Sequence, residues 1–350
     1  MINQSFMPRL KNVFPTKKTS LVSVLVPLRN EQKNVEALVK NLKKLTYPNL
    51  EFIFLDDQSS DRTQELLRQQ SHQLANSKLL NGNPLPKGWV GKVYACHQLS
   101  QQAAGEYLLF LDADVRLEPN TIELSLELLD KKRVGLLSGF PKFPVDGFLA
   151  SLLVPMQHVL IYLHLPLYLA NYTTYAAASA AHGSFMFFDS KIYRSFGGHQ
   201  AVKSSLVEDV HLTRAVKQSG ERTCLANMTS HVTCYMYHSN REVWNGFSKN
   251  AFPGIGRSFL LAVIVISFYS LAFVLPLLLL WFAFTLHWLW ALPLVISLMI
   301  RLLIDWLSNQ KIWIGLFMPF SALSFIIILI RSMYLSLNKS GFTWKGRTYS

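Results

Sequence analysis

Cysteine is scarce in this sequence, and the few cysteines form no pattern. The 350 residues include three of them, Cys96, Cys224 and Cys234, with no Cys-x-x-Cys pair. A disulfide framework needs an even number of cysteines, and common zinc sites use closely spaced cysteine pairs. The scarcity therefore argues against both and suits a reducing compartment.

Charge is also in short supply, and it is unevenly distributed. Charged residues make up 16% of the chain, whereas soluble domains average about 25%. Positions 1–257 have the composition of an ordinary globular chain, but from Phe259 onward the sequence is almost continuously apolar. The length leaves room for a large catalytic domain and a further region.

The net positive charge, +13, lacks the arrangement that nucleic-acid binding requires. The cations are scattered, with no basic stripe that alternates with aromatic residues. An anionic membrane surface and a phosphate-bearing substrate remain as partners that explain the positive charge. We therefore predict a membrane partner and no nucleic acid. The first twenty residues contain no apolar core of a signal peptide, which predicts a cytoplasmic location for the domain that follows.

Short apolar runs alternate with helical patterns in the first part of the chain. Runs at 21–27, 50–55 and 107–111 predict buried strands, and the spacing at 34–45 and 62–73 predicts helices. This alternation indicates βαβ units and a mostly parallel sheet of the α/β class. Ligands of such sheets bind at the carboxyl ends of the strands.

Acidic pairs follow two of these strands. Asp56 and Asp57 end the second, and Asp112-Ala113-Asp114 follows the third. An Asp-x-Asp pair can hold Mg²⁺ or Mn²⁺, with diphosphate oxygens completing the shell. Taken alone, each pair is as compatible with a solvated turn, so the shared position at strand ends is what favours a site.

Two further segments carry candidate chemistry. Pro27-Leu28-Arg29-Asn30-Glu31 follows the first strand, and Arg29 is placed to face a phosphate. Glu208 and Asp209 precede a helical pattern, and a carboxylate there can take a proton from an acceptor hydroxyl. The alternative for this acidic pair is stabilisation of the helix dipole, worth up to about 1 kcal/mol.

The order of these four motifs resembles the family 2 inverting glycosyltransferases, which have a GT-A fold. The segments Leu85–Lys92 (LPKGWVGK) and Thr343–Tyr349 (TWKGRTY) are similar to a membrane-bound branch that includes diaponeurosporenoate (carotenoid) and hopanoid-associated glycosyltransferases. The resemblance implies a Rossmann-like, mostly parallel sheet flanked by helices and followed by transmembrane helices.

The resemblance also implies roles for residues at matching positions. The donor, a uridine diphosphate sugar, would have its base in a pocket lined by Pro27, Glu31, Asp56 and Asp57. Asp112 would touch ribose or metal, Asp114 would ligate the metal, and Lys92 would reach the diphosphate.

On the acceptor side, Asp209 would be the general base and Glu208 would shape the site. The Gln-x-x-Arg-Trp motif of processive relatives is missing, and Arg241-Glu242-Val243-Trp244 stands in the corresponding region. This departure favours a single transfer over polymer synthesis. Arg241, Trp244 and Arg347 are candidates for diphosphate or acceptor contacts, and the alternative for the cations is attraction to the leaflet, worth about 1 kcal/mol each.

The apolar C-terminal part predicts about three membrane spans, near 259–281, 286–307 and 313–335. Proline and histidine interrupt the apolar segment 148–170, which predicts an interfacial helix, a broken amphipathic pair or a buried core helix. The expected organisation comprises four regions: a polar arm at 1–20, a catalytic domain at 21–257, transmembrane or re-entrant helices at 258–336 and a basic tail at 337–350.

Cations predict the topology only in part. Lys249, Arg257 and Lys311 agree on a cytoplasmic side. The basic tail would then lie outside if the third segment crosses fully, unless Pro319 breaks that segment into a re-entrant hairpin.

We therefore expect a multi-pass protein of the cell membrane with its catalytic domain in the cytoplasm. The expected activity moves a sugar, glucose by preference, from a UDP-sugar to a lipid-like acceptor such as a carotenoid carboxylic acid. The alternatives are the same chemistry on a hopanoid, diacylglycerol, ceramide or polyprenyl phosphate, and a non-catalytic membrane scaffold.

Overall fold

The computed structural model describes residues 2–10, 14, 18–237, 239–338, 342–344 and 347–349. The chain forms two compact units. The first comprises Met1–Lys142 and Leu165–Cys234, and the second comprises Phe143–His164 and Tyr235–Ser350.

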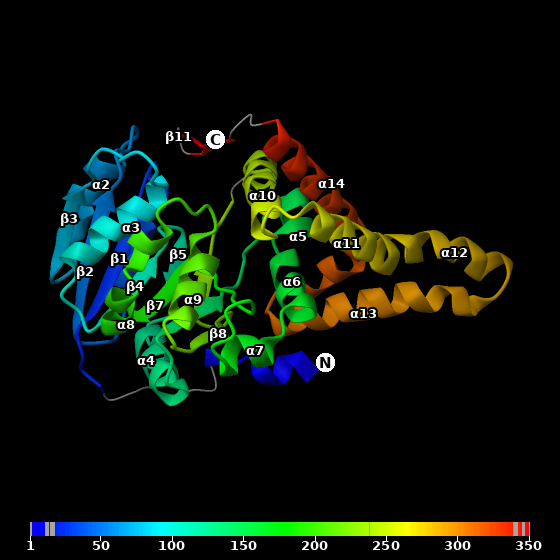
Figure 1. Ribbon diagram of the computed structural model, residues 1–350, viewed down its shortest axis with the longest axis horizontal. Helices are drawn as coiled ribbons and strands as arrows, with labels where there is room; N and C mark the ends of the chain where they lie inside the picture. Colours follow the sequence, from blue (N-terminus) through cyan, green and yellow to red (C-terminus); the bar gives the residue numbers. More distant parts are fainter. Residues whose placement is uncertain are drawn as a thin grey trace. The chain divides into compact units, whose positions relative to one another are not determined.

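The first unit is built on a seven-stranded sheet flanked by helices (Figure 1). Its strand order is β3-β2-β1-β4-β7-β6-β8, and among these strands only β7 runs antiparallel to its neighbours. The strands are β1 (Val22–Leu28), β2 (Leu50–Asp56), β3 (Ser77–Asn81), β4 (Tyr107–Leu111), β6 (Leu136–Phe140), β7 (Phe185–Asp189) and β8 (Thr223–Asn227). A small second sheet pairs β5 (Val115–Leu117) with β9 (Val232–Cys234). The mostly parallel α/β sheet predicted from the sequence is confirmed.

Helices bury one face of this sheet. The helices of the unit are α1 (Val35–Leu42), α2 (Thr63–Gln70), α3 (Gly91–Gln102), α4 (Thr121–Lys132), α7 (Leu167–Tyr172), α8 (Ser190–Ser195) and α9 (Glu208–Gln218), with 3₁₀-helices at Ile2–Phe6, Ser71–Gln73 and Gly198–Val202. Strand side chains alternate between faces, so Leu25, Ile53 and Phe110 point to the same side. There they pack in one core with Leu99 of α3 and Leu212 of α9.

The register of the sheet brings the ends of three strands to one edge. Leu28 of β1 lies opposite Asp56 of β2, and both strands run parallel. β4 pairs with β1 on the other side, also in parallel, with Phe110 opposite Leu25. The loops that follow β1, β2 and β4 therefore begin at the same edge, as expected for a parallel sheet.

The second unit is helical. Its elements are α5 (Phe148–Leu153), α6 (Met156–His164), α10 (Asn240–Gly254), α11 (Phe259–Tyr269), a π-helix (Ser270–Val274), α12 (Leu275–Thr285), a 3₁₀-helix (Trp288–Ala291), α13 (Leu292–Leu307), a 3₁₀-helix (Ile312–Phe317), α14 (Met318–Leu337) and the hairpin β10 (Phe342–Trp344) and β11 (Arg347–Tyr349). Three stretches are long and apolar enough to cross a membrane, Phe259–Thr285, Trp288–Leu307 and Ile312–Leu337. The three apolar helical segments predicted for this region are thus present, and α12 runs beside α13 (Figure 1).

Prolines in the apolar segments have effects that depend on their position in a helix. Pro319 lies in the first turn of α14, where proline is tolerated because its missing N–H would have no helical partner. Of the two alternatives for the third segment, a break at Pro319 is not observed, because α14 continues from Met318 to Leu337. Pro155 and Pro166 do separate the apolar segment 148–170 into α5, α6 and α7.

A buried ion pair lies inside the second unit. Arg301 Nε donates to Asp305 Oδ2 at 2.8 Å within α13, and both side chains are fully buried. The guanidinium also contacts the sulfurs of Met156 in α6, at 3.0 Å, and Met318 in α14, at 3.8 Å. One charged side chain thus joins three helices of the unit. Ionisable pairs inside apolar segments are costly and mark positions where the partner is essential.

Removing one member of this pair leaves an unpaired buried charge, which costs about 3–5 kcal/mol. We expect R301M or D305L alone to lower the unfolding temperature of the detergent-solubilised protein sharply. The double variant R301M/D305L removes both charges and should recover most of that loss. If the unfolding temperature of the double variant falls by the sum of the decreases in the two single variants, pairing has no role in stability.

Candidate active site

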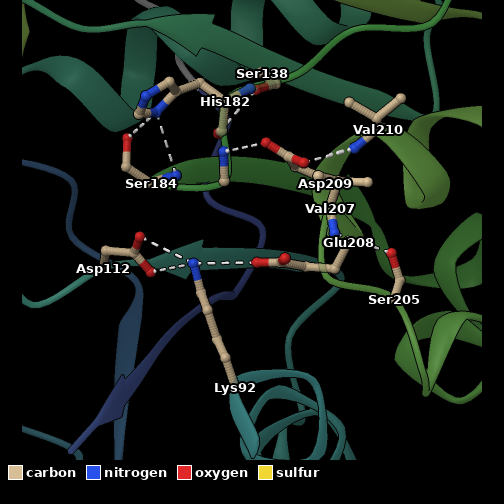
Figure 2. A network of polar contacts seen from close by, with 11 residues as sticks. Lys92, Asp112, Ser138, His182, Ser184, Ser205, Val207, Glu208, Asp209 and Val210 are labelled. Atoms are coloured by element: carbon tan, nitrogen blue, oxygen red, sulfur yellow. Dashed lines mark hydrogen bonds and ion pairs between the residues drawn. The ribbon is translucent and has the colours of Figure 1, made fainter. Parts of the chain in front are cut away.

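A single lysine joins the carboxylates of two loops (Figure 2). Lys92 Nζ, from the first turn of α3, lies 2.8 Å from Asp112 Oδ1 and 3.0 Å from Asp112 Oδ2. The same nitrogen lies 3.2 Å from Glu208 Oε1, at the start of α9. Lys92 therefore brings together the Asp-x-Asp segment after β4 and the acidic pair of α9, which are far apart in the sequence.

Burial and charge act in opposite directions on Lys92. Burial alone would lower its pKa, but the negative charges of Asp112 and Glu208 outweigh burial and hold the pKa well above the usual value. Lys92 is therefore a fixed cation throughout the physiological range. A fixed cation between two carboxylates is suited to bind the phosphates of a nucleotide.

Asp209 is held by the backbone at both oxygens. Its Oδ1 accepts the N–H of Val210 at 2.8 Å, and its Oδ2 accepts the N–H of Gly183 at 3.1 Å. Burial and the adjacent Glu208 raise the pKa of Asp209 to about 7, although both hydrogen bonds and Lys92 act to lower it. A carboxyl group that titrates near neutral pH is well matched to general-base chemistry.

The segment around Gly183 was not singled out by the sequence. Ser184 O accepts the N–H of Asp112 at 3.2 Å, while the neighbouring Gly183 N–H donates to Asp209. A Cβ at Gly183 would lie 3.5 Å from Glu208 Oε1 and from Lys92 Nζ. This glycine therefore occupies the centre of the charged network and keeps space there. In a single sequence, Ala-His-Gly-Ser carries no pattern that would reveal this role.

The residues expected around the nucleobase lie at the ends of β1 and β2. Asp56 is 4% exposed, and its Oδ1 has no hydrogen-bond partner among the described residues. Arg29 donates to the backbone carbonyls of Asp57, at 2.5 Å, and Gln58, at 3.0 Å. A buried carboxylate oxygen without a protein partner is available to accept a hydrogen bond from water or from a ligand.

Two other residues of this loop were also expected to line the nucleobase pocket. Pro27 lies within β1, opposite Leu55. Glu31 accepts from Asn34 Nδ2 at 2.8 Å. Its negative charge acts on Asp112, so the loop after β1 and the loop after β4 share one electrostatic environment.

Asp112 and Asp114 offer hard oxygen ligands for a divalent cation. Asp114 Oδ1 lies 3.7 Å from the sulfur of Cys234 in β9, a neighbour that the sequence did not indicate. Within the described residues, no group of three or more His, Cys, Asp or Glu side chains is arranged to hold a metal ion. This donor set fits Mg²⁺ or Mn²⁺ that is completed by substrate phosphates, since these ions often use only one or two carboxylates of the protein.

The other expected contacts lie elsewhere in the chain. Arg241 is exposed on α10 of the second unit. In the same unit, the ring of Trp244 faces the guanidinium of Arg331 at 5.2 Å. The side chain of Arg347 lies outside the described residues.

Comparison with known proteins identifies the family. The family model for glycosyl transferase family 2 matches residues 23–197, which is half of the chain. The chain belongs to glycosyl transferase family 2. The matched range contains the candidate base pocket, Lys92 and the Asp-x-Asp segment, and it ends before Glu208.

Relatives of this family 2 chain support the same assignment. A 4,4'-diaponeurosporenoate glycosyltransferase from Staphylococcus haemolyticus is 34% identical over 118 residues, which is 33% of this chain and 30% of the relative. A beta-monoglucosyldiacylglycerol synthase from Trichormus variabilis is 31% identical over 116 residues, 33% of this chain and 24% of the relative. The chain thus spans less than a third of the length of these relatives.

A solved structure resembles the family 2 chain over nearly its whole length. This structure is a mannosyltransferase from Pyrobaculum calidifontis in complex with GDP-Man and Mn²⁺. The match covers 93% of this chain and 90% of the mannosyltransferase, with a TM-score of 0.57 and 17% sequence identity. At this identity the likeness shows the fold alone, and it confirms the GT-A fold expected from the sequence.

The pKa of Asp209 predicts how activity responds to pH. Since the ionised form accepts the proton, transfer to a hydroxyl acceptor should fall as pH drops through about 7 and reach about one tenth one pH unit lower. E208Q removes a neighbouring negative charge, so the acidic midpoint of kcat/KM should move to lower pH. K92M removes a cation, so the midpoint should move to higher pH. The same midpoint in all three proteins would rule out this electrostatic coupling.

Proposed function

We propose that this protein is an inverting glycosyltransferase that transfers a sugar, with glucose as the expected one, from a UDP-sugar to a lipid-like acceptor at the cytoplasmic face of the membrane. The observation that carries the proposal is the bridge from Asp112 through Lys92 to Glu208, beside Asp209. In a chain of family 2, these contacts support a role for Lys92 as the cation that would bind phosphates between the Asp-x-Asp segment and a candidate base.

The donor would lie along the shared strand edge. The unpartnered Oδ1 of Asp56 suits the imide N–H of uracil, because a carboxylate only accepts hydrogen bonds. Lys92 contacts Asp112. When the donor binds, a phosphate oxygen would replace this carboxylate as the partner of Lys92. Asp112 and Asp114 would hold a divalent cation, which neutralises charge on the leaving diphosphate.

The acceptor would approach Asp209. For a hydroxyl acceptor, Asp209 takes the proton as the oxygen attacks the anomeric carbon and the bond to the diphosphate breaks. A carotenoid carboxylic acid is already ionised near neutral pH, so for it Asp209 would orient the acceptor. The resemblance to a diaponeurosporenoate glycosyltransferase and to a glucosyldiacylglycerol synthase favours acceptors with long apolar chains.

The second unit would place this chemistry at the bilayer. Its spans Phe259–Thr285 and Trp288–Leu307 are mostly exposed, with 17% and 22% of their apolar windows buried. Such exposed apolar surface suits contact with lipid. Lys249, Arg257 and Lys311 would then lie on the cytoplasmic side, next to the anionic leaflet.

Replacing Asp209 with Asn tests the catalytic assignment. The amide keeps the size of the side chain but cannot take a proton, so D209N should reduce transfer to an alcohol acceptor by about 100-fold or more. Calorimetry should show that UDP still binds with Mn²⁺ present. The matched control D146N changes an exposed carboxylate and should keep full activity. Full activity of D209N on an alcohol would remove Asp209 from the mechanism.

A comparison of lipids tests the acceptor class and the scaffold alternative. Lipids are extracted from cells with and without the gene, and their masses are compared. The proposal expects one family of lipids to lose the mass of a hexose when the gene is absent. Unchanged lipids, together with no heat on titrating UDP and Mn²⁺ into the purified protein, would favour a non-catalytic scaffold.

A further inference from the structure

Helix α9 carries a second lysine of interest, Lys217, which is buried near its C-terminal end. Lys217 is 2% exposed, and no acidic side chain pairs with it among the described residues. Instead its Nζ donates to the backbone carbonyls of Ala170 and Ala178, both at 2.8 Å. Two more carbonyls, of Leu169 and Tyr175, lie at 3.3 and 3.4 Å. Lysines are almost never fully buried unless they are paired. The burial of Lys217 among backbone carbonyls therefore requires an explanation.

The four carbonyls belong to the segment that leads to Gly183. This segment begins at the end of α7 and runs toward β7. Past Ala178 it reaches Gly183, whose N–H donates to Asp209 Oδ2 at 3.1 Å. Asp209 and Lys217 stand on the same helix, roughly 12 Å apart along its axis at 1.5 Å per residue. Helix α9 therefore contacts one segment at two places. The carboxylate at the start of the helix accepts a hydrogen bond from the segment, and the ammonium at the end of the helix donates to it.

An ammonium suits this position better than other side chains. It donates up to three hydrogen bonds and accepts none, so it can gather carbonyls that come from different residues of an irregular segment. The carbonyls of Leu169 and Tyr175 also accept from Thr173 Oγ1 and from the N–H of Ala178. Lys217 therefore matters most for the carbonyls of Ala170 and Ala178, which are its two nearest acceptors. In the sequence, Lys217 looks like an ordinary cation near a helix C-terminus, which is why the pattern does not reveal it.

We propose that Lys217 is a positioning residue for Asp209. Lys217 fixes the segment 169–183, and Gly183 of this segment holds the carboxylate of Asp209 in place. This inference rests on the proposed function only in its catalytic readout. The ammonium and the carboxylate act on the same backbone segment. Loss of Lys217 would release the carbonyls and loosen the segment before Gly183, so that Ser138 and Asp112, which contact His182 and Ser184, would hold Gly183 beside Asp209 less firmly. The residues at the ends of β1 and β2 would keep their positions.

The test compares K217M, K217R and the control R214M, which changes an exposed cation on the same helix. K217M should lower kcat about 10- to 100-fold, because small displacements of a catalytic group have effects of this size. The KM for the donor should stay within about twofold of the wild type, since the pocket at the strand ends is unchanged. K217R, whose guanidinium also donates to carbonyls, should recover most of the loss, and R214M should match the wild type.

Hydrogen exchange of the full-length protein gives a readout that does not depend on activity. In K217M the peptide covering 169–183 should exchange faster, while peptides of β1 and β2 keep their protection. If the wild type transfers no sugar, the proposed function fails, and this exchange result alone decides the role of Lys217. Unchanged exchange at 169–183, or a kcat for K217M equal to that of R214M, would overturn the inference. The inference would also be overturned if K217M raised the donor KM and lowered kcat and K217R recovered neither. Such a result would show general disruption of the fold.

Discussion

The contact of one ammonium with two carboxylates organises the candidate site. Lys92 reaches Asp112 after β4 and Glu208 at the start of α9, and these segments would repel each other without a cation between them. Two like charges in a partly buried place are unfavourable, so the cation is what allows three acidic side chains to share one region. Burial and, after it, the negative charge of the adjacent Glu208 raise the pKa of Asp209 to about 7.

The sequence predicted the sheet correctly, for a physical reason. β1, β2 and β4 are buried apolar runs that end directly in polar residues, and parallel strands bring such ends to one edge. Once the sheet was predicted, the position of Asp56 and Asp112 at the same edge followed from topology. Helix and strand limits differed by a few residues, because the last turn of an element depends on contacts that a periodic pattern does not encode.

Other residues near α9 could not be singled out from the sequence. Glu208 and Asp209 stood out as acids at a helix start, but Gly183, which donates to Asp209, and Lys217, which contacts the segment before Gly183, did not. A glycine is informative only when its neighbours in space are known, and its position between Lys92 and Glu208 arises from the tertiary fold. Lys217 shows the same limit, because its four partners are backbone atoms and leave no trace in residue type. The sequence left a break at Pro319 open, and α14 shows none because proline is tolerated in a first turn and disrupts a helix only in its interior.

The central claim is that the Lys92 bridge marks the place where donor and acceptor meet. The most direct test is an experimental structure of the full-length protein with UDP and Mn²⁺ bound. The account predicts that uracil lies against Asp56, that the diphosphate lies beside Lys92, and that Asp209 faces the same space. A nucleotide bound away from the ends of β1, β2 and β4, or Asp57, Asp114 and Asp209 on separate faces, would contradict it.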